Sequence, residues 1–242
     1  MNALTKECSA ELLKAIRAPA YLIPTLLFPV LFYAVFGVLI AGGNAQQATY
    51  MLATYGVFAA MGPALFGFGV GLSLERDKGW LDLKRVMPMP PSNYLIAKLV
   101  AALVSSAAAI LLIYAVAIVL GGVVLTTGQF AQLFLAHLAA VFPFVFIGLT
   151  IGLLLKGQPA LAFTNVLNLG LALLGGLFMP LQFFPELMQK IGQVLPSYHA
   201  AQVALSVTDA TDANALQSLA ILAVFTLFFA ILALLSWGRQ QR

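Results

Sequence analysis

Six stretches of about twenty or more residues in this chain contain no Asp, Glu, Lys or Arg. A helix of about twenty apolar residues crosses the hydrocarbon core of a bilayer, and it satisfies its own backbone hydrogen bonds there. Only 8% of the 242 residues are charged, whereas soluble domains average about 25%. We therefore predict an all-α integral membrane protein with six transmembrane helices. The spans are expected at residues 20–41, 50–74, 99–120, 130–155, 159–179 and 216–237.

Lysine and arginine are unequally distributed between the two sides of these predicted spans. Eleven of the 12 fall in the N-terminus, the C-terminus and the loops after the second and fourth spans, whereas Lys190 alone falls on the opposite side. In multi-pass proteins the short loops rich in lysine and arginine face the cytoplasm. We therefore expect a multi-pass protein of the cell inner (plasma) membrane with both termini in the cytoplasm.

Two segments outside the spans have patterns of their own. Residues 1–19 combine an apolar stripe with charged positions, which is typical of an amphipathic helix lying in the membrane interface. The loop at 180–215 is long yet rather apolar, and residues 185–195 within it have the periodicity of a short helix. We predict that this loop re-enters the outer membrane face; the alternative is a surface loop packed on the helix ends.

Residues 75–85 hold seven of the 20 charged side chains in the chain. If this stretch is helical, Trp80, Leu83 and Met87 form a narrow apolar stripe along it. Prolines from Pro88 onward end such a helix, because proline donates no backbone hydrogen bond. A plain cytoplasmic loop needs only cations, but three acidic residues are interleaved here. We therefore predict a docking element for a partner protein rather than an ordinary solvated loop.

The charged stretch contains the pattern E-R-x-x-G followed nine residues later by proline. This pattern resembles the signature of ABC-2-type transporter permeases, the transmembrane subunits of type-2 ABC exporters. Its residues are Glu75, Arg76, Gly79 and Pro88. Trp80 and Met87 stand where family members usually carry threonine. The long loop is similar to the family's re-entrant segment through the motifs GLFMP at 176–180, FPEL at 184–187 and LPSY at 195–198.

The resemblance covers the whole chain and implies a single transmembrane domain, residues 1–242, that exports a substrate with ATP hydrolysed by a separate subunit. Residues 75–91 are then a cytoplasmic coupling helix seated in a cleft of the ATPase, and residues 1–19 are the connecting helix beside it. The ATPase-coupling residues implied are Glu75, Arg76, Asp77, Lys78, Gly79, Asp82, Lys84 and Arg85.

The resemblance also implies partners. We expect two cytoplasmic ABC ATPase subunits, a second permease copy that is identical or a paralogue, and membrane lipid, but no nucleic acid. The sequence contains no G-x-x-x-x-G-K-[ST] loop to hold nucleotide phosphates. ATP and Mg are therefore expected on the partner subunit, with no cofactor and no catalytic residue in this chain.

The family builds its transport path largely from the second and fifth spans at the dimer interface. By this resemblance the substrate path consists of Met61, Phe66, Asn165 and Asn168. The two asparagines lie three residues apart and face roughly one way; the alternative for them is hydrogen bonding to a neighbouring helix. Because polar groups are sparse in the spans, we expect a hydrophobic or amphipathic cargo of the drug, lipid or glycan class.

Two other classes of membrane protein require residues that are sparse or absent in this sequence. A self-contained channel or secondary transporter needs ionisable residues inside the spans for ion coupling, and His137 is the sole example. An intramembrane serine protease needs a nucleophile facing a base, and the G-x-S-x-G pattern is absent. His137 and His199 are isolated and Cys8 is the single cysteine, so no metal site is predicted.

Glycines in two of the spans follow the small-xxx-small pattern of closely packed membrane helices. The pairs are Gly67 with Gly71 in the second span and Gly148 with Gly152 in the fourth. Without a side chain, each glycine allows another backbone to approach closely. We therefore expect these two spans to pack closely against other helices at these positions.

Overall fold

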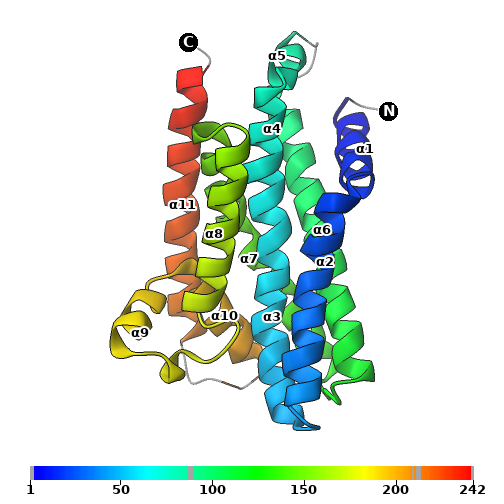
Figure 1. The fold of residues 1–242 in the computed structure, drawn as a ribbon, viewed down its shortest axis with the longest axis vertical. Coiled ribbons are helices and arrows are strands. Elements are labelled where there is room, and N and C mark those ends of the chain that lie inside the picture. Colours follow the sequence, from blue (N-terminus) through cyan, green and yellow to red (C-terminus); the bar gives the residue numbers. More distant parts are fainter. Residues whose placement is uncertain (1–2, 87–89, 209, 211–213, 241–242) are drawn as a thin grey trace.

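The structure, a computed structural model, describes residues 3–86, 90–208, 210 and 214–240. In these residues every regular element is a helix, and the helices form one elongated bundle (Figure 1). The all-α class predicted from the apolar runs is confirmed for this part of the chain. The elements are α1 (Ala3–Ile16), α2 (Pro19–Tyr33), the π-helix η1 (Ala34–Ile40), α3 (Ala45–Leu65), the π-helix η2 (Phe66–Gly71), α4 (Leu72–Asp77), α5 (Trp80–Arg85), α6 (Pro91–Val119), α7 (Thr127–Leu154), α8 (Gln158–Leu174), the 3₁₀ helix η3 (Leu181–Phe183), α9 (Glu186–Gly192), α10 (Pro196–Val207) and α11 (Ala215–Gln240).

Within the described residues, five helices are long and apolar enough to cross a membrane. They correspond to five of the six predicted spans. These helices are Ile23–Ile40, Ala45–Asp77, Ser92–Val119, Thr127–Leu154 and Ala215–Gly238. The remaining predicted span, 159–179, overlaps α8, which has 17 residues. α8 ends five residues early because Gly175 and Gly176 follow it and Gly176 adopts a left-handed φ of 74°, which ends a helix.

The second and third spans extend furthest beyond their predicted bounds. The second runs without interruption from Ala45 through η2 to Asp77, and the side chain of Asn44 caps its first turn. The third begins at Pro91, where proline fits the first turn, rather than at residue 99. Both extensions carry charged residues into the helices, because those side chains find partners within the protein.

The centre of the bundle is α3, which is buried on every side along most of its length. It packs against α6, α7, α2 and α10. α7 approaches it most closely at Gly148 and Gly152: a Cβ on Gly152 would lie 2.4 Å from the Phe68 carbonyl oxygen. The close packing predicted for this glycine pair is therefore confirmed. In η2 the glycine that faces α7 is Gly69, which the sequence pattern did not single out.

A hydrogen-bonded histidine connects three of the spans inside the bundle. His137 on α7 is buried, with its Nε2 2.9 Å from the carbonyl oxygen of Ala53 on α3. Its Nδ1 lies 3.0 Å from the hydroxyl of Tyr114 on α6. Since a carbonyl only accepts, Nε2 donates and Nδ1 accepts from the tyrosine. Gly56 makes room for the ring, because a Cβ there would lie 2.1 Å from it.

The predicted outer loop contains more helix than the sequence suggested. The short helix expected within residues 185–195 is present as α9, whose side chains are largely exposed. A second helix, α10, was not predicted. It is largely buried and packs against α3, α7 and α11. α9 and α10 lie in the half of the bundle opposite the end at which α1 and α5 lie (Figure 1).

The predicted N-terminal amphipathic helix is present as α1, but its orientation differs from a simple apolar-in arrangement. Its buried residue is Glu11, whereas Leu13 and Ile16 are exposed. α1 packs against α6, and its charged face contributes to the network described below. The helix therefore directs Glu11 toward the protein and leaves Leu13 and Ile16 exposed, while Leu4 and Leu12 are half-buried.

Candidate functional site at the charged end of the bundle

The charged stretch begins as a continuation of the second span and then turns sharply. Helix α4 ends at Asp77, and Gly79 follows in the left-handed conformation with a φ of 72°. The amide groups of Lys78 and Gly79 donate to carbonyls of the last turn, which completes a glycine C-cap. The chain then forms α5. The segment predicted as one coupling helix over 75–91 is thus two short helices, and residues 87–89, with Pro88, lie outside the described residues.

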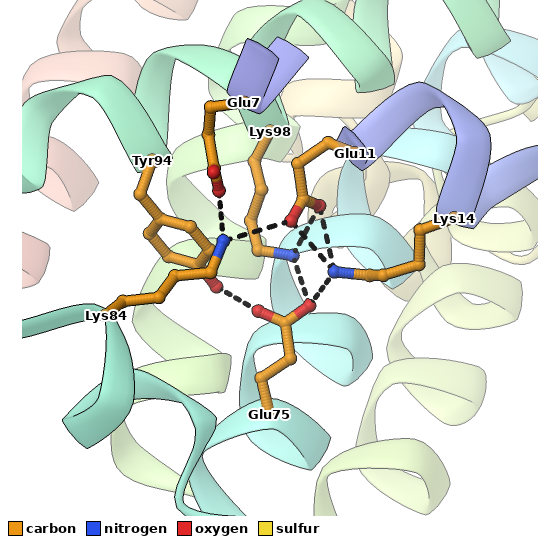
Figure 2. A network of polar contacts seen from close by, with 7 residues as sticks. All are labelled: Glu7, Glu11, Lys14, Glu75, Lys84, Tyr94 and Lys98. Atoms are coloured by element: carbon orange, nitrogen blue, oxygen red, sulfur yellow. Dashed lines mark hydrogen bonds and ion pairs between the residues drawn. The ribbon is translucent and has the colours of Figure 1, made fainter. Parts of the chain in front are cut away.

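Glu75 points away from solvent into a buried ion-pair network (Figure 2). Its Oε1 accepts from the ammonium of Lys98 on α6 at 3.0 Å, and also from Lys14 on α1. Its Oε2 accepts from the hydroxyl of Tyr94 on α6. One carboxylate therefore joins the end of the second span to α1 and to the start of the third span.

A second carboxylate, Glu11 of α1, completes the same network. It lies 3.2 Å from the ammonium of Lys98 and 2.9 Å from that of Lys14. Lys84 of α5 lies 3.6 Å from Glu11 and pairs with Glu7 one helical turn earlier. The network therefore also fixes α5 against α1.

Charge is balanced within this network, which is why so many ions tolerate burial. Its members are the carboxylates of Glu7, Glu11 and Glu75 and the ammonium groups of Lys14, Lys84 and Lys98 (Figure 2). Lys98 is 5% exposed and Glu75 is 4% exposed. Burial by itself lowers the pKa of Lys14, but the carboxylates of Glu75 and Glu11 raise that pKa above its ordinary value. Lys14 therefore stays charged at neutral pH and holds its two partners.

On the opposite side of α4, Arg76 and Ser73 hold the end of α7. The Arg76 guanidinium donates to the carbonyl oxygens of Gly152 and Leu153, the latter at 2.6 Å, and the Ser73 hydroxyl donates to that of Leu155. The last carbonyls of a helix have no partner within it and carry the negative end of its dipole. Arg76 satisfies two of them, so α4 is fastened to α7 as well as to α1 and α6.

The remaining residues of the charged stretch face outward. Asp77, Lys78 and Asp82 are exposed, and so are the apolar side chains Leu83 (61%) and Val86 (81%). Trp80 is partly exposed beside them, with the Lys78 ammonium 5.4 Å from its ring centroid. Arg85 ends α5, and its side chain lies outside the described residues. Exposed apolar groups among charges at a rigid tip form a surface suited to protein contact.

The structure does not gather the predicted substrate-path residues into one place. Met61 is fully buried in α3, whereas Phe66 lines a cavity next to the charged network. On α8, Asn165 is exposed and donates to the Leu161 carbonyl of its own helix, while Asn168 is 8% exposed. The two asparagines therefore differ in environment. The buried Asn168 Oδ1 has no hydrogen-bond partner within the described residues.

Sequence reasoning missed five members of the network: Glu7, Glu11, Lys14, Tyr94 and Lys98. One signal was available for α1. Glu7, Glu11 and Lys14 recur every three or four residues, so they lie on one face of the helix. Lys98, at the boundary of an apolar span, had no such local signal, because its partners are distant in sequence.

The chain is similar to known proteins over most of its length. Residues 7–208 match the sequence model of the family described as ABC-2 type transporter. The chain is also 32% identical over 203 residues to YvfS of Bacillus subtilis (strain 168), which is provisionally named a transport permease. That alignment covers 82% of this chain and 82% of YvfS.

Proposed function

The chain belongs to the ABC-2 type transporter family and is a membrane-embedded transport permease, and we propose that it is the transmembrane subunit of an ATP-driven exporter. The observation that carries this proposal is the form of the charged stretch. Its tip is exposed and partly apolar, whereas its base is fastened to three other helices. In such an arrangement, movement of a partner bound at the tip displaces the spans to which the base is attached.

In this proposal α5 is the surface that docks on an ABC ATPase subunit. Trp80, Leu83 and Val86 supply apolar contact, and Asp77, Lys78 and Asp82 supply charge around them. Interfaces of this kind combine an apolar centre with a polar rim. ATP and Mg are bound by the partner, two ATPase subunits serve one pair of permeases, and this chain contributes no cofactor of its own.

The proposed route of coupling starts at Gly79, where α5 joins α4. Movement of α5 reaches the second span directly, since α4, η2 and α3 form one continuous helix. Glu75 carries it to α1 and α6, and Arg76 carries it to α7. ATP drives the transition to the extent that it binds one arrangement of the complex more tightly than the other.

We propose six crossings, with α8 as the fifth. At 1.5 Å per residue its 17 residues extend about 26 Å, close to the thickness of about 30 Å of the hydrocarbon core. An even number of crossings returns the chain to its starting side, and α1, α5 and the last turns of α11 lie at one end of the bundle (Figure 1). That end is the cytoplasmic one in this proposal, in the inner (plasma) membrane, and α9 and α10 form the outer re-entrant segment.

The substrate path is proposed at the contact between two permease copies. Asn165 is a polar side chain exposed in the middle of an apolar helix, where contact with lipid tails is unfavourable. A second copy or a cargo molecule offers the amide better partners than lipid does. The apolar side chains exposed around it on α8, among them Val166 and Leu169, favour a hydrophobic or amphipathic cargo.

Affinity purification tests the proposal. The tagged chain is extracted from its native membrane, and the eluate is analysed for an ATPase subunit and for vanadate-sensitive ATP hydrolysis. Leu83→Asp introduces a charge at the exposed tip, and we expect it to remove the ATPase. The matched control is Val124→Asp, since Val124 is 90% exposed in the loop between α6 and α7, away from α5. A folded Leu83→Asp chain that retains the ATPase, or a wild-type complex without one, contradicts the proposal.

A further inference from the structure

A cavity of about 320 Å³ lies between α1, η2, α4 and α6, directly beside the charged network. Small residues on facing helices create the space. They are Gly67 and Gly71 in η2 and Ala101, Ala102 and Ser105 on α6. The glycine pair that the sequence suggested for helix contact therefore opens a cavity instead. Its position at the end of the spans places it level with the boundary between lipid tails and headgroups.

Most of the cavity wall is apolar. Phe66, Val70 and Leu74 line it from the second span, and Ala15 and Ala18 line it from the N-terminal side. Apolar cavities in proteins take up apolar ligands rather than water; a cavity of about 150 Å³ already accepts benzene. The volume here is about twice that value, so an extended hydrocarbon segment is a suitable occupant.

One end of the cavity is charged, and cations are in excess. The charged lining residues are Glu11, Lys14, Glu75, Lys78 and Lys98, that is, three ammonium groups and two carboxylates. Lys78 lies at the exposed side of this end, with Trp80 next to it. Tryptophan and lysine are the side chains that membrane proteins place at the level of lipid headgroups.

We propose that this cavity binds an anionic phospholipid of the leaflet that meets the charged end of the bundle. One acyl chain lies along Phe66, Val70 and Leu74, and the phosphate lies beside Lys78 at the cationic end. The occupant is a phospholipid because the site combines an apolar chamber with a cationic end at headgroup level. The lipid contacts both α1 and α4, so it stabilises the packing of the connecting helix on the second span. Lys78 and Trp80 lie where this site borders the proposed ATPase-docking surface, so binding is measured on the permease alone.

Native mass spectrometry of the purified full-length chain in detergent, titrated with dioleoylphosphatidylglycerol, measures the binding. Ala101→Phe fills the cavity. Each methylene group of the acyl chain that is excluded from an apolar site lowers the affinity for the lipid about fourfold. If the new phenylalanine excludes two methylene groups, the variant should bind the lipid about fifteenfold more weakly than the wild type. Ala108→Phe is the matched control, since Ala108 is exposed on the same helix, and we expect its affinity within about twofold of wild type. Equal affinity for the wild type and Ala101→Phe would overturn the proposal.

The headgroup preference is tested separately with dioleoylphosphatidylcholine as the second lipid. We expect the wild type to prefer the phosphatidylglycerol, and Lys78→Gln to lose most of that preference. Lys156→Gln removes an exposed cation from the turn after α7 and should keep it. Because Lys78 is exposed, its replacement leaves the fold intact even where Ala101→Phe fails to fold. Equal affinity of the wild type for both lipids, or an unchanged preference in Lys78→Gln, would overturn the assignment of an anionic lipid.

Discussion

Glu75 is the residue on which the charged end of the molecule depends. A single carboxylate accepts hydrogen bonds from Lys14, Lys98 and Tyr94, which belong to two different helices. The removal of one member of a buried ion pair is more costly than the removal of both, because a lone charge remains buried. The network is therefore sensitive to any change that alters its charge at one point.

We expect Glu75→Gln to lower the free energy of unfolding by about 3 kcal/mol, the lower end of the range for breaking a buried ion pair. The lower end applies because Glu11 still faces both ammonium groups. Denaturant titration of the purified chain in detergent micelles measures the change. Glu186→Gln on the exposed α9 is the control and should alter stability by less than about 0.5 kcal/mol.

The double variant Glu75→Gln/Lys98→Met separates charge pairing from packing. If the two side chains interact as the structure shows, the double variant loses less stability than the sum of the single variants. Strict additivity would mean that their ion pair contributes nothing.

His199 on α10 gives the stability of the molecule a dependence on pH. Burial lowers the pKa of His199 below its ordinary value, although a backbone hydrogen bond opposes the shift. The unfolded chain therefore binds a proton below about pH 6.5 more readily than the folded one does, and stability is lost as pH falls through that value. We expect the wild type to lose more thermal stability between pH 7.5 and pH 5.5 than His199→Asn does. An equal loss in both proteins would assign the effect to other groups.

At the scale of helices, the crossing of α3 and α7 depends on the hydrogen-bonded ring of His137. Both ring nitrogens are engaged, so the ring cannot move aside when a neighbour grows. We expect Gly56→Ala to destabilise the protein by about 1–3 kcal/mol, the usual range for overpacking. Gly170→Ala on α8 is the control: a Cβ there meets nothing within 4 Å, and alanine favours helix by up to about 1 kcal/mol. Thermal unfolding in detergent compares the two; equal stability would show that the ring yields.

The sequence predicted elements whose signal is local. Apolar runs located the five long apolar helices, the amphipathic pattern located α1, and the glycine pair at 148 and 152 identified a helix contact. It did not predict pairings between distant residues: Glu11 and Lys98 are 87 residues apart, and nothing near either one specifies the other. α10 was missed because twelve residues are too few for a span, and its burial depends on three other helices.

For the whole molecule, the two ends of the bundle differ in chemistry. The end with α1 and α5 carries the buried ion pairs and an exposed tip, whereas the opposite end carries α9 and α10 (Figure 1). α9 exposes Leu187, Met188 and Ile191. An exposed apolar helix beside membrane spans is stable where it contacts lipid. The proposal of a re-entrant outer segment therefore rests on the same exposed residues that make α9 unsuited to water.

The proposed orientation of the molecule in the membrane rests on its distribution of lysine and arginine, and cysteine labelling tests it. In a Cys8→Ser background, single cysteines replace Lys190 on α9 and Lys156 in the turn after α7, both exposed. In sealed right-side-out vesicles, a membrane-impermeant maleimide should label Lys190→Cys at once and Lys156→Cys only after the vesicles are opened, if the cation-rich side is cytoplasmic as we propose. The reverse pattern would invert the orientation. The role of α8 as a span requires an odd number of membrane crossings between residues 156 and 190, because α8 is the long helix between them. Labelling of both cysteines from outside would place both residues on one side and would contradict that role.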